Sequence, residues 1–282
     1  MARTGTLTQC YVDESVQSAR GFVVTSFVFA NGKFDREVAE TLRGVGLTPR
    51  RDEFKSSIRM NSNPRMRAAR DKLLSLAGSQ ARVAVFFGPY ERATICKHSL
   101  QALQSILVRN GIRPSRLTVY FDEDIFRSEK EAVRLHELFR FLRAVCIHPQ
   151  ENSQLRLGIQ VADAVAHSFG QILKEELTGK HKLIDIGGPN MGYAPGTTEP
   201  LGWSLLMTLR NALMTRPMVY DKGEYMAAAD PVVLDPVRDD PSNYGQHPIL
   251  LGWGVQVAPE AEADLRQAVE RALGRIWLGC IH

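Results

Sequence analysis

Four carboxylates in well separated segments of the chain could support chemistry through their type and position. They are Asp13 in TLTQCYVDES, Glu53 in RRDEFKSS, Asp122 in SRLTVYFDED and Asp163 in IQVADAVA. A single acid at a strand end is commonly a turn residue. Four such acids brought together would repel one another unless a cation lay between them. Mg²⁺ and Mn²⁺ prefer oxygen ligands, and a pair of these ions suits phosphoryl transfer with an activated water.

Asp163 has the most informative surroundings of the four acids. It lies in the apolar run IQVADAVA, so whichever way it points it is close to apolar surface. Gln160 and His167 lie three residues before it and four after it, on the same face of a helix. The pattern fits an Asp at the edge of the core that is satisfied by hydrogen bonds. It fits equally a polar stripe aimed at a site where other carboxylates converge.

The spacing of apolar residues predicts the elements that must position these acids. Strands are expected over 7–13, 20–32, 81–88, 115–124 and 144–149. Helices are expected over 33–46, 63–78, 91–110, 128–143 and 155–177. We expect Asp13 and Asp122 to end their strands and Pro149 to stop the last one. Strands followed by alternating strands and helices predict an α/β fold with a mixed central sheet flanked by helices.

The ordered set of motifs resembles a known family. YVDES, EFKSS, VYFDED and IQVADAVAHSF follow one another as in the domain of unknown function 3800 family, which looks like a branch of the ribonuclease H-like superfamily. The resemblance covers about residues 7–178. It implies a mixed sheet of about five strands with flanking helices, and acids that coordinate metal for cleavage of nucleic-acid phosphodiesters.

Carried over to this sequence, the resemblance makes Asp13, Glu53, Asp122 and Asp163 both the catalytic residues and the ligands of two Mg²⁺ or Mn²⁺ ions. The sequence departs from the usual DESG by having Val16 after Ser15. Because a glycine at that point eases a turn, the departure affects the placement of Glu14 more than that of Asp13. The resemblance also suggests a role in phage defence or in mobile elements.

Four further residues are candidates for supporting roles. Glu14 faces away from Asp13 in a regular strand, and Asp124 could replace Asp122 if the strand ends early. Lys55 could orient a scissile phosphate or balance the carboxylates, and a solvated ion pair explains it equally well. His167 is either a proton shuttle or metal ligand, or a histidine on the helix surface.

Charge is distributed unevenly along the chain. Residues 1–150 contain 24 Lys and Arg against 15 Asp and Glu, whereas residues 151–282 contain 11 against 16. The basic stretch beside Glu53 is expected to bind phosphates of DNA or RNA, since backbone contacts supply most sequence-independent affinity. The residues predicted to bind nucleic acid are Arg50, Arg51, Arg59, Arg65, Arg67 and Arg70.

Composition and the chain ends indicate a cytoplasmic protein. The N-terminal segment lacks the apolar stretch of a signal peptide, and no run of about 18 apolar residues could span a membrane. The four cysteines are too widely spaced for a zinc site or a redox dithiol, which fits a reducing compartment.

The last hundred residues have a different texture. After residue 180 come a loop-rich stretch, helical patterns over 203–214 and 259–277, and a proline- and acid-rich segment over 229–248. We expect a nuclease core over 1–179 and a mainly helical and irregular C-terminal extension over 180–282, packed on the core. The extension is a candidate surface for a protein partner or a homodimer.

These features favour a metal-dependent nuclease. Two alternatives fit the same residues: a non-catalytic member that binds nucleic acid or protein, and a phosphoesterase that acts on small nucleotides.

Overall fold

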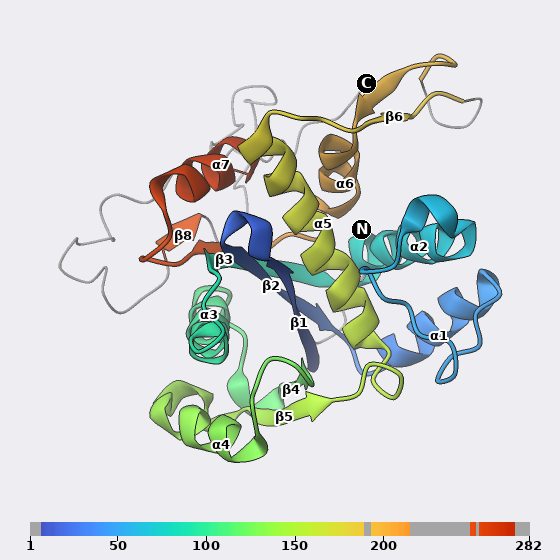
Figure 1. Cartoon of the computed structure of the whole chain (residues 1–282). Coiled ribbons are helices and arrows are strands. Elements are labelled where there is room, and N and C mark those ends of the chain that lie inside the picture. Colours follow the sequence, from blue (N-terminus) through green and yellow to red (C-terminus); the bar gives the residue numbers. More distant parts are fainter. Residues whose placement is uncertain (1–6, 189–192, 215–248, 252–253, 274–282) are drawn as a thin grey trace, which may run out of the picture.

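A seven-stranded mixed sheet forms the centre of the molecule in the computed structural model, which describes residues 7–188, 193–214, 249–251 and 254–273 (Figure 1). The strand order is β5–β4–β1–β2–β3–β9–β8. The strands are β1 (Gln9–Gln17), β2 (Phe22–Ala30), β3 (Arg82–Pro89), β4 (Thr118–Asp122), β5 (Cys146–Glu151), β8 (Ile249–Leu251) and β9 (Val255–Val257).

The first five strands form a mixed sheet. Strands β1, β2 and β3 form an antiparallel meander, and β4 and β5 add to the β1 side in parallel. The predicted mixed sheet with flanking helices is thereby confirmed. The sheet is also wider than expected, because β9 pairs in parallel with β3 and β8 pairs antiparallel with β9. The segment 229–248 lies outside the described residues.

Two predicted strand ends were wrong. Strand β1 continues four residues past Asp13 to Gln17, because β2 pairs with it along its whole length. Strand β5 continues past Pro149 to Glu151. It lies at the edge of the sheet, where a residue without an amide hydrogen is tolerated.

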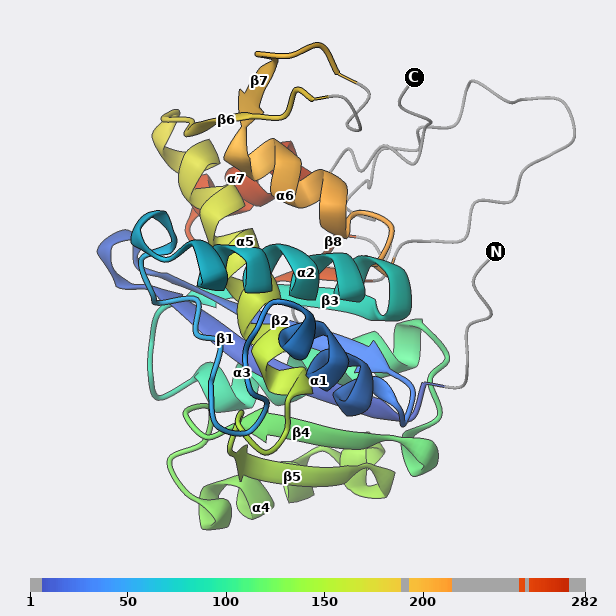
Figure 2. The same cartoon turned by 90° about the vertical axis from the view of Figure 1, so that its right-hand side faces the viewer.

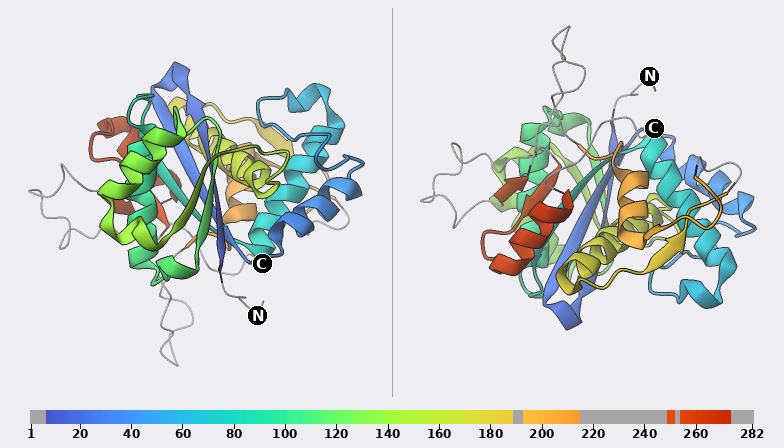
Figure 3. Two further views of the ribbon diagram at one scale, coloured as in Figure 1. Left: turned by 90° about the horizontal axis from the view of Figure 1, so that it is seen from below. Right: turned by 90° about the horizontal axis from the view of Figure 1, so that it is seen from above.

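Helices cover both faces of the sheet (Figure 2). They are α1 (Phe34–Gly44), α2 (Pro64–Gln80), α3 (Ile95–Arg109), α4 (Glu129–Leu138), α5 (Gly158–Thr178), α6 (Leu201–Leu209) and α7 (Ala263–Leu273). Neighbouring residues of β2 identify the two faces: Thr25 contacts Ser99 of α3, whereas the Ser26 hydroxyl donates to the Ala162 carbonyl of α5. Helices α1, α2 and α6 lie on the α5 side, and α4 lies on the α3 side (Figure 3).

Helix α5 crosses the sheet directly over β1 and β2, and two glycines permit the close approach. A Cβ on Gly158 would lie 2.5 Å from the Tyr11 ring, and one on Gly170 would lie 2.8 Å from the Gln17 amide. A two-stranded sheet of β6 (Leu183–Asp185) and β7 (Thr198–Pro200) connects α5 to α6. Side chains of α6, α7 and β9 belong to the same hydrophobic core as the first five strands. None of the described helices is long and apolar enough to cross a membrane.

Candidate active site

Asp13 and Asp122 lie where β1 and β4 part. The last residues paired between these parallel strands are Val12 and Phe121, so the two acids are the next residue on each strand. Tyr11 and Tyr120 stack with ring centroids 5.5 Å apart, two residues before each acid. Because side chains alternate along a strand, both acids are turned to the face on which Tyr11 lies beneath α5. The sheet register therefore brings together two residues that are more than a hundred positions apart in sequence.

Asp163 is held over the same point by α5. Ser26 is the partner of Asp13 in the β1–β2 register, and its hydroxyl donates a 2.8 Å hydrogen bond to the Ala162 carbonyl. This contact places the turn of α5 that carries Asp163 beside Asp13. The charge of Asp163 is the largest electrostatic influence on Asp13, followed by that of Asp122.

Burial and mutual repulsion make these carboxyl groups hard to ionise. Desolvation, reinforced by the charges of Asp163 and Asp122, raises the pKa of Asp13 well above its usual value. Desolvation is also the main reason that the pKa values of Asp122 and Asp163 are raised to about 6. Three acids with raised pKa values, two from the point where β1 and β4 part and one from α5, form an unusual concentration of buried acidic groups.

The loop that carries Glu53 is clamped to α5 by two side chains from one helix face. The Gln160 amide oxygen accepts from the Phe54 backbone amide (2.9 Å), and Asp163 Oδ2 accepts from that of Ser56 (2.7 Å). Glu53 is thus beside Asp163, and its charge contributes to the raised pKa of that residue. Its own carboxylate accepts a short hydrogen bond from the Ser153 hydroxyl and lies 3.4 Å from Lys55 Nζ.

The donor chemistry of the site suits a hard divalent cation, but the side chains do not surround one as placed. Among the described residues, no group of three or more His, Cys, Asp or Glu side chains is arranged to hold a metal ion. Glu53 is paired with Lys55 and Ser153, and Asp13 Oδ1 accepts from the Glu14 amide at 2.6 Å. The raised pKa values of the acids and a buried oxygen of Glu14, Oε2, that has no hydrogen-bond partner both point to unbalanced negative charge.

Glu14 and Asp124 are connected through Arg92. The Arg92 guanidinium lies 3.3 Å from Glu14 Oε1 and donates a short hydrogen bond to the Asp124 carbonyl. Burial and the nearby charge of Asp122 raise the pKa of Glu14 to about 7, although Arg92 opposes the shift. Through its contacts with Glu14 and Asp124, Arg92 links β1 to the segment after β4.

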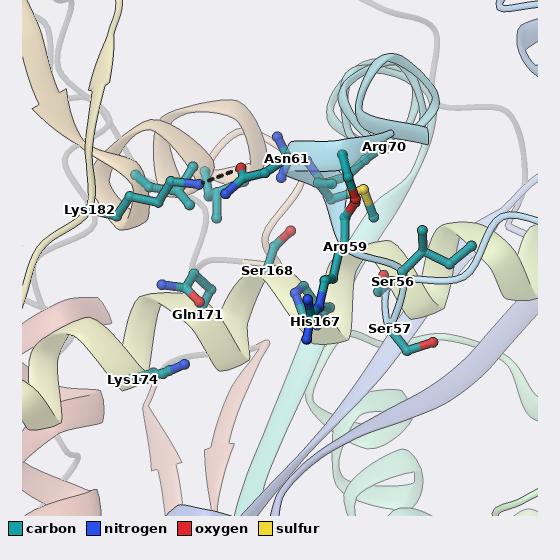
Figure 4. Close-up of a pocket in the computed structure, with 15 residues that line it drawn as sticks. Ser56, Ser57, Arg59, Asn61, Arg70, His167, Ser168, Gln171, Lys174 and Lys182 are labelled. Carbon is teal, nitrogen blue, oxygen red and sulfur yellow. Dashed lines mark hydrogen bonds between the residues drawn. The ribbon is translucent and has the colours of Figure 1, made fainter. Parts of the chain in front are cut away.

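The predicted basic residues fall into two groups. Arg59 and Arg70 line a hollow along α5 together with His167 (Figure 4). The others lie elsewhere, and three of them have partners. Arg51 and Arg65 are paired with Asp52, at 3.4 and 3.9 Å, and Arg67 donates to the Met60 carbonyl. Arg50 lies in the turn just before the Glu53 loop, where its backbone has a positive φ of 70°.

Several residues of the site were missed by sequence reasoning. Ser153 lies five residues before the start of α5, and its hydroxyl donates to Glu53. Gln160 is fully buried and bridges Phe54 to the Ser153 carbonyl. Its position three residues before Asp163 was the one available signal. Nothing in the local sequence identified Arg92, since its partners come from distant segments.

Comparison with known proteins gives similarities of structure alone. No protein-family model and no curated protein sequence matches the chain. It is similar to a crystal structure of a mutant of Bst-RNase HIII, with 12% identity and a TM-score of 0.38, over 63% of this chain and 56% of that one. It is also similar to a chain of the PCNA:RNase HII complex from Archaeoglobus fulgidus, with 13% identity and a TM-score of 0.38, over 78% of this chain and 100% of that one.

Proposed function

We propose that this protein is a divalent-metal-dependent nuclease, a member of the domain of unknown function 3800 branch of the ribonuclease H-like superfamily. The observation that carries the proposal is the meeting of Asp13, Asp122 and Asp163 beneath α5, each with a raised pKa. Buried carboxylates that face one another are costly to a fold unless a cation balances them.

In this proposal Asp13, Asp122 and Asp163 hold Mg²⁺ or Mn²⁺, and Glu53 joins them. To bind the metal, Glu53 would have to give up its ion pair with Lys55, which lies 3.4 Å away and is half-exposed. Lys55 is then free to bind an oxygen of the scissile phosphate. Bound divalent cations lower the pKa of the attacking water and stabilise the leaving oxygen.

His167 has a separate role in the proposal. It lies one helical turn beyond Asp163. Burial and the charges of Arg70 and Lys174 lower the pKa of its imidazole. The ring is therefore neutral near pH 7 and can accept a proton from the reaction or from water.

The decisive experiment is a cleavage assay on single- and double-stranded DNA and RNA with Mg²⁺, Mn²⁺ or a chelator. We expect metal-dependent cleavage of at least one substrate, and no cleavage by Asp163→Asn. Asparagine keeps an oxygen that can accept from the Ser56 amide, so this variant should fold. Metal-independent cleavage, or full activity of Asp163→Asn, would contradict the proposal.

One observation favours the non-catalytic alternative. Glu53 forms an ion pair with Lys55 and accepts from Ser153, which are contacts a purely structural carboxylate would make. Calorimetric titration with Mn²⁺ separates the two functions. Binding that disappears in Asp13→Asn supports the nuclease, and no binding to the wild type supports the alternative.

The wider context follows from the same proposal. Residues 1–179 would form the nuclease core and 180–282 an extension packed on it. A cytoplasmic location and a role in phage defence or mobile elements accompany the family assignment.

A further inference from the structure

The hollow beside the acids is a cavity of about 700 Å³ along the middle of α5. One wall is the segment 56–62, which includes the short helix η2 (Met60–Ser62). The helices α2 and α5 form a second wall, and the C-terminal extension forms a third. The extension contributes Lys182 and two residues of α6, Leu201 and Leu205. The cavity is therefore incomplete without residues beyond 180.

Four cations line this cavity, and the described residues that line it include no carboxylate. They are Arg59, Arg70, Lys174 and Lys182. Arg70 also contacts Asp71 at 2.7 Å, and Lys182 donates to the Asn61 side chain at 3.3 Å. Arg59 and Lys174 form no ion pair with any other described side chain. Two cations without an ion-pair partner in the part of the chain that the structure describes favour an anionic ligand in this concave site.

The rest of the lining is both apolar and polar. Ile58, Met60, Leu201 and Leu205 present hydrocarbon surface. Gln171 of α5 adds a polar side chain whose amide nitrogen also donates to Glu175 (Figure 4). Inorganic phosphate needs no apolar wall. A nucleotide has both an anionic phosphate and a flat base or sugar that can lie on such a surface.

The cavity lies next to the acid site. Ser56 lines it, and the amide of the same residue donates to Asp163. At the helical rise, His167 lies about 6 Å and Lys174 about 16 Å along the axis from Asp163. A stacked strand advances about 3.4 Å per nucleotide. A strand whose scissile phosphate lies at the acids would therefore place a nucleotide about two to five positions away in the cavity.

We infer that this cavity is a subsite for one nucleotide of the nucleic-acid substrate, with its phosphate on Arg59 and Lys174 and its base or sugar on the apolar wall that α6 completes. The inference deepens the proposed nuclease function, since it rests on that function for the identity of the bound strand as substrate. It gives the C-terminal extension a role in substrate binding. The phosphate is either an internal diester or a terminal monoester, and these share the same anionic chemistry.

The test measures binding without cleavage. The probe is a fluorescent single-stranded 12-nucleotide DNA or RNA, titrated with full-length protein in the presence of chelator and followed by anisotropy. We expect Arg59→Ala/Lys174→Ala to bind about tenfold or more weakly than the wild type at low salt. Because each phosphate neutralised on a single strand contributes about 0.7 to the slope of log K against log salt, loss of this one phosphate contact should lower the slope by about 0.7.

A matched control is Arg113→Ala/Lys130→Ala, which removes the same charge from exposed positions on other elements. This control should bind like the wild type. Equal losses in both double variants, or wild-type binding by Arg59→Ala/Lys174→Ala, would overturn the subsite. Comparing probes with a 5′ phosphate and a 5′ hydroxyl identifies the source: a preference for the phosphorylated probe that the double variant loses indicates a terminal phosphate, and equal affinity indicates an internal one.

The apolar wall has its own test. Leu205→Ala should weaken binding of the base-bearing probe a few-fold and leave binding of an abasic probe of equal length unchanged. An equal effect on both probes would overturn the contact with the base.

Failure of the subsite and failure of the nuclease are distinguishable. Cleavage by the wild type, with binding unchanged in Arg59→Ala/Lys174→Ala, overturns the subsite alone. Binding that depends on the two cations, without cleavage under any metal, overturns the proposed function and leaves a nucleotide-binding cavity.

Discussion

Two clusters of opposite charge share helix α5 and are built in different ways. The acid cluster of Asp13, Asp122 and Asp163 comes from two central strands and the helix, and its members are largely shielded from water. The cationic cavity comes from a loop, two helices and the C-terminal extension. Sheet register fixes Asp13 and Asp122, and α5 fixes Asp163. Of the cations, Arg70 is paired with Asp71 and Lys182 with Asn61, whereas Arg59 and Lys174 form no ion pair with a described side chain.

The opposite charges of the two clusters explain why the pKa values of the acids are raised and that of His167 in the cationic cavity is lowered. Burial disfavours the charged form of any group, so it raises the pKa of the acids and lowers that of His167. Neighbouring charges of like sign add to the shift in both clusters. In the proposed nuclease, the acids would bind a cation and the cavity an anionic group of the substrate.

The largest expected effect breaks the acid cluster. Asp13→Asn should lower the cleavage rate about 10³-fold, or about 4 kcal/mol of transition-state stabilisation, because it removes a ligand of the proposed metal site. Rates are measured under saturating Mn²⁺, and the fold is checked by circular dichroism. Glu129→Gln, which neutralises an exposed acid of α4, should keep wild-type activity. Cleavage by Asp13→Asn at the wild-type rate would remove this residue from the site.

The next effect tests how rigidly the acid cluster is held. Gly158→Ala should destabilise the protein by about 2 kcal/mol, because its Cβ would lie 2.5 Å from the buried Tyr11 ring and force α5 away from β1. Urea unfolding measures the change. Gly44→Ala is the control, since a Cβ there meets nothing within 4 Å and the expected change is within about 0.5 kcal/mol. Equal stability of both variants would mean that α5 is loosely placed.

A smaller effect concerns pH. Asp122 and Asp163 have folded pKa values of about 6 against an ordinary value of 3.8, so the folded state holds more protons than the unfolded state between these limits. The stability of the metal-free protein should therefore rise as the pH falls from 7 towards 4. The contribution of these two groups is then complete below about pH 4. Thermal unfolding across this range checks the sign.

A matched variant sharpens the pH prediction. Asp163→Asn cannot ionise, so its melting temperature should change less between pH 7 and pH 5 than that of the wild type. Mn²⁺ should raise the melting temperature of the wild type more at pH 7 than at pH 5, because the ligands must lose their protons to bind it. A wild-type protein that loses stability steadily below pH 7 would contradict the pKa assignment.

Sequence reasoning located the acids but not the contacts that hold them. Asp163 was identified because an acid in an apolar helix is rare, and Asp122 because it follows a short apolar strand. Glu53 was placed beside them by resemblance, but its pairing with Lys55 and Ser153 required coordinates. Arg92 was missed, and the contact of Gln160 with Phe54 was not predicted, because an isolated polar residue carries no signal of a partner in a distant segment.

By itself, the sequence determined the order of the strands and helices and which residue types each presents to the core, because apolar periodicity and turn residues are local properties. Only the tertiary structure decided that β1 continues past Asp13, that pairing with β4 stops at Val12, and that the extension supplies two strands of the central sheet and a wall of the cavity. These features depend on pairing and packing between distant segments. The free energy of such a contact depends on both segments, so it cannot be predicted from the sequence of either segment alone.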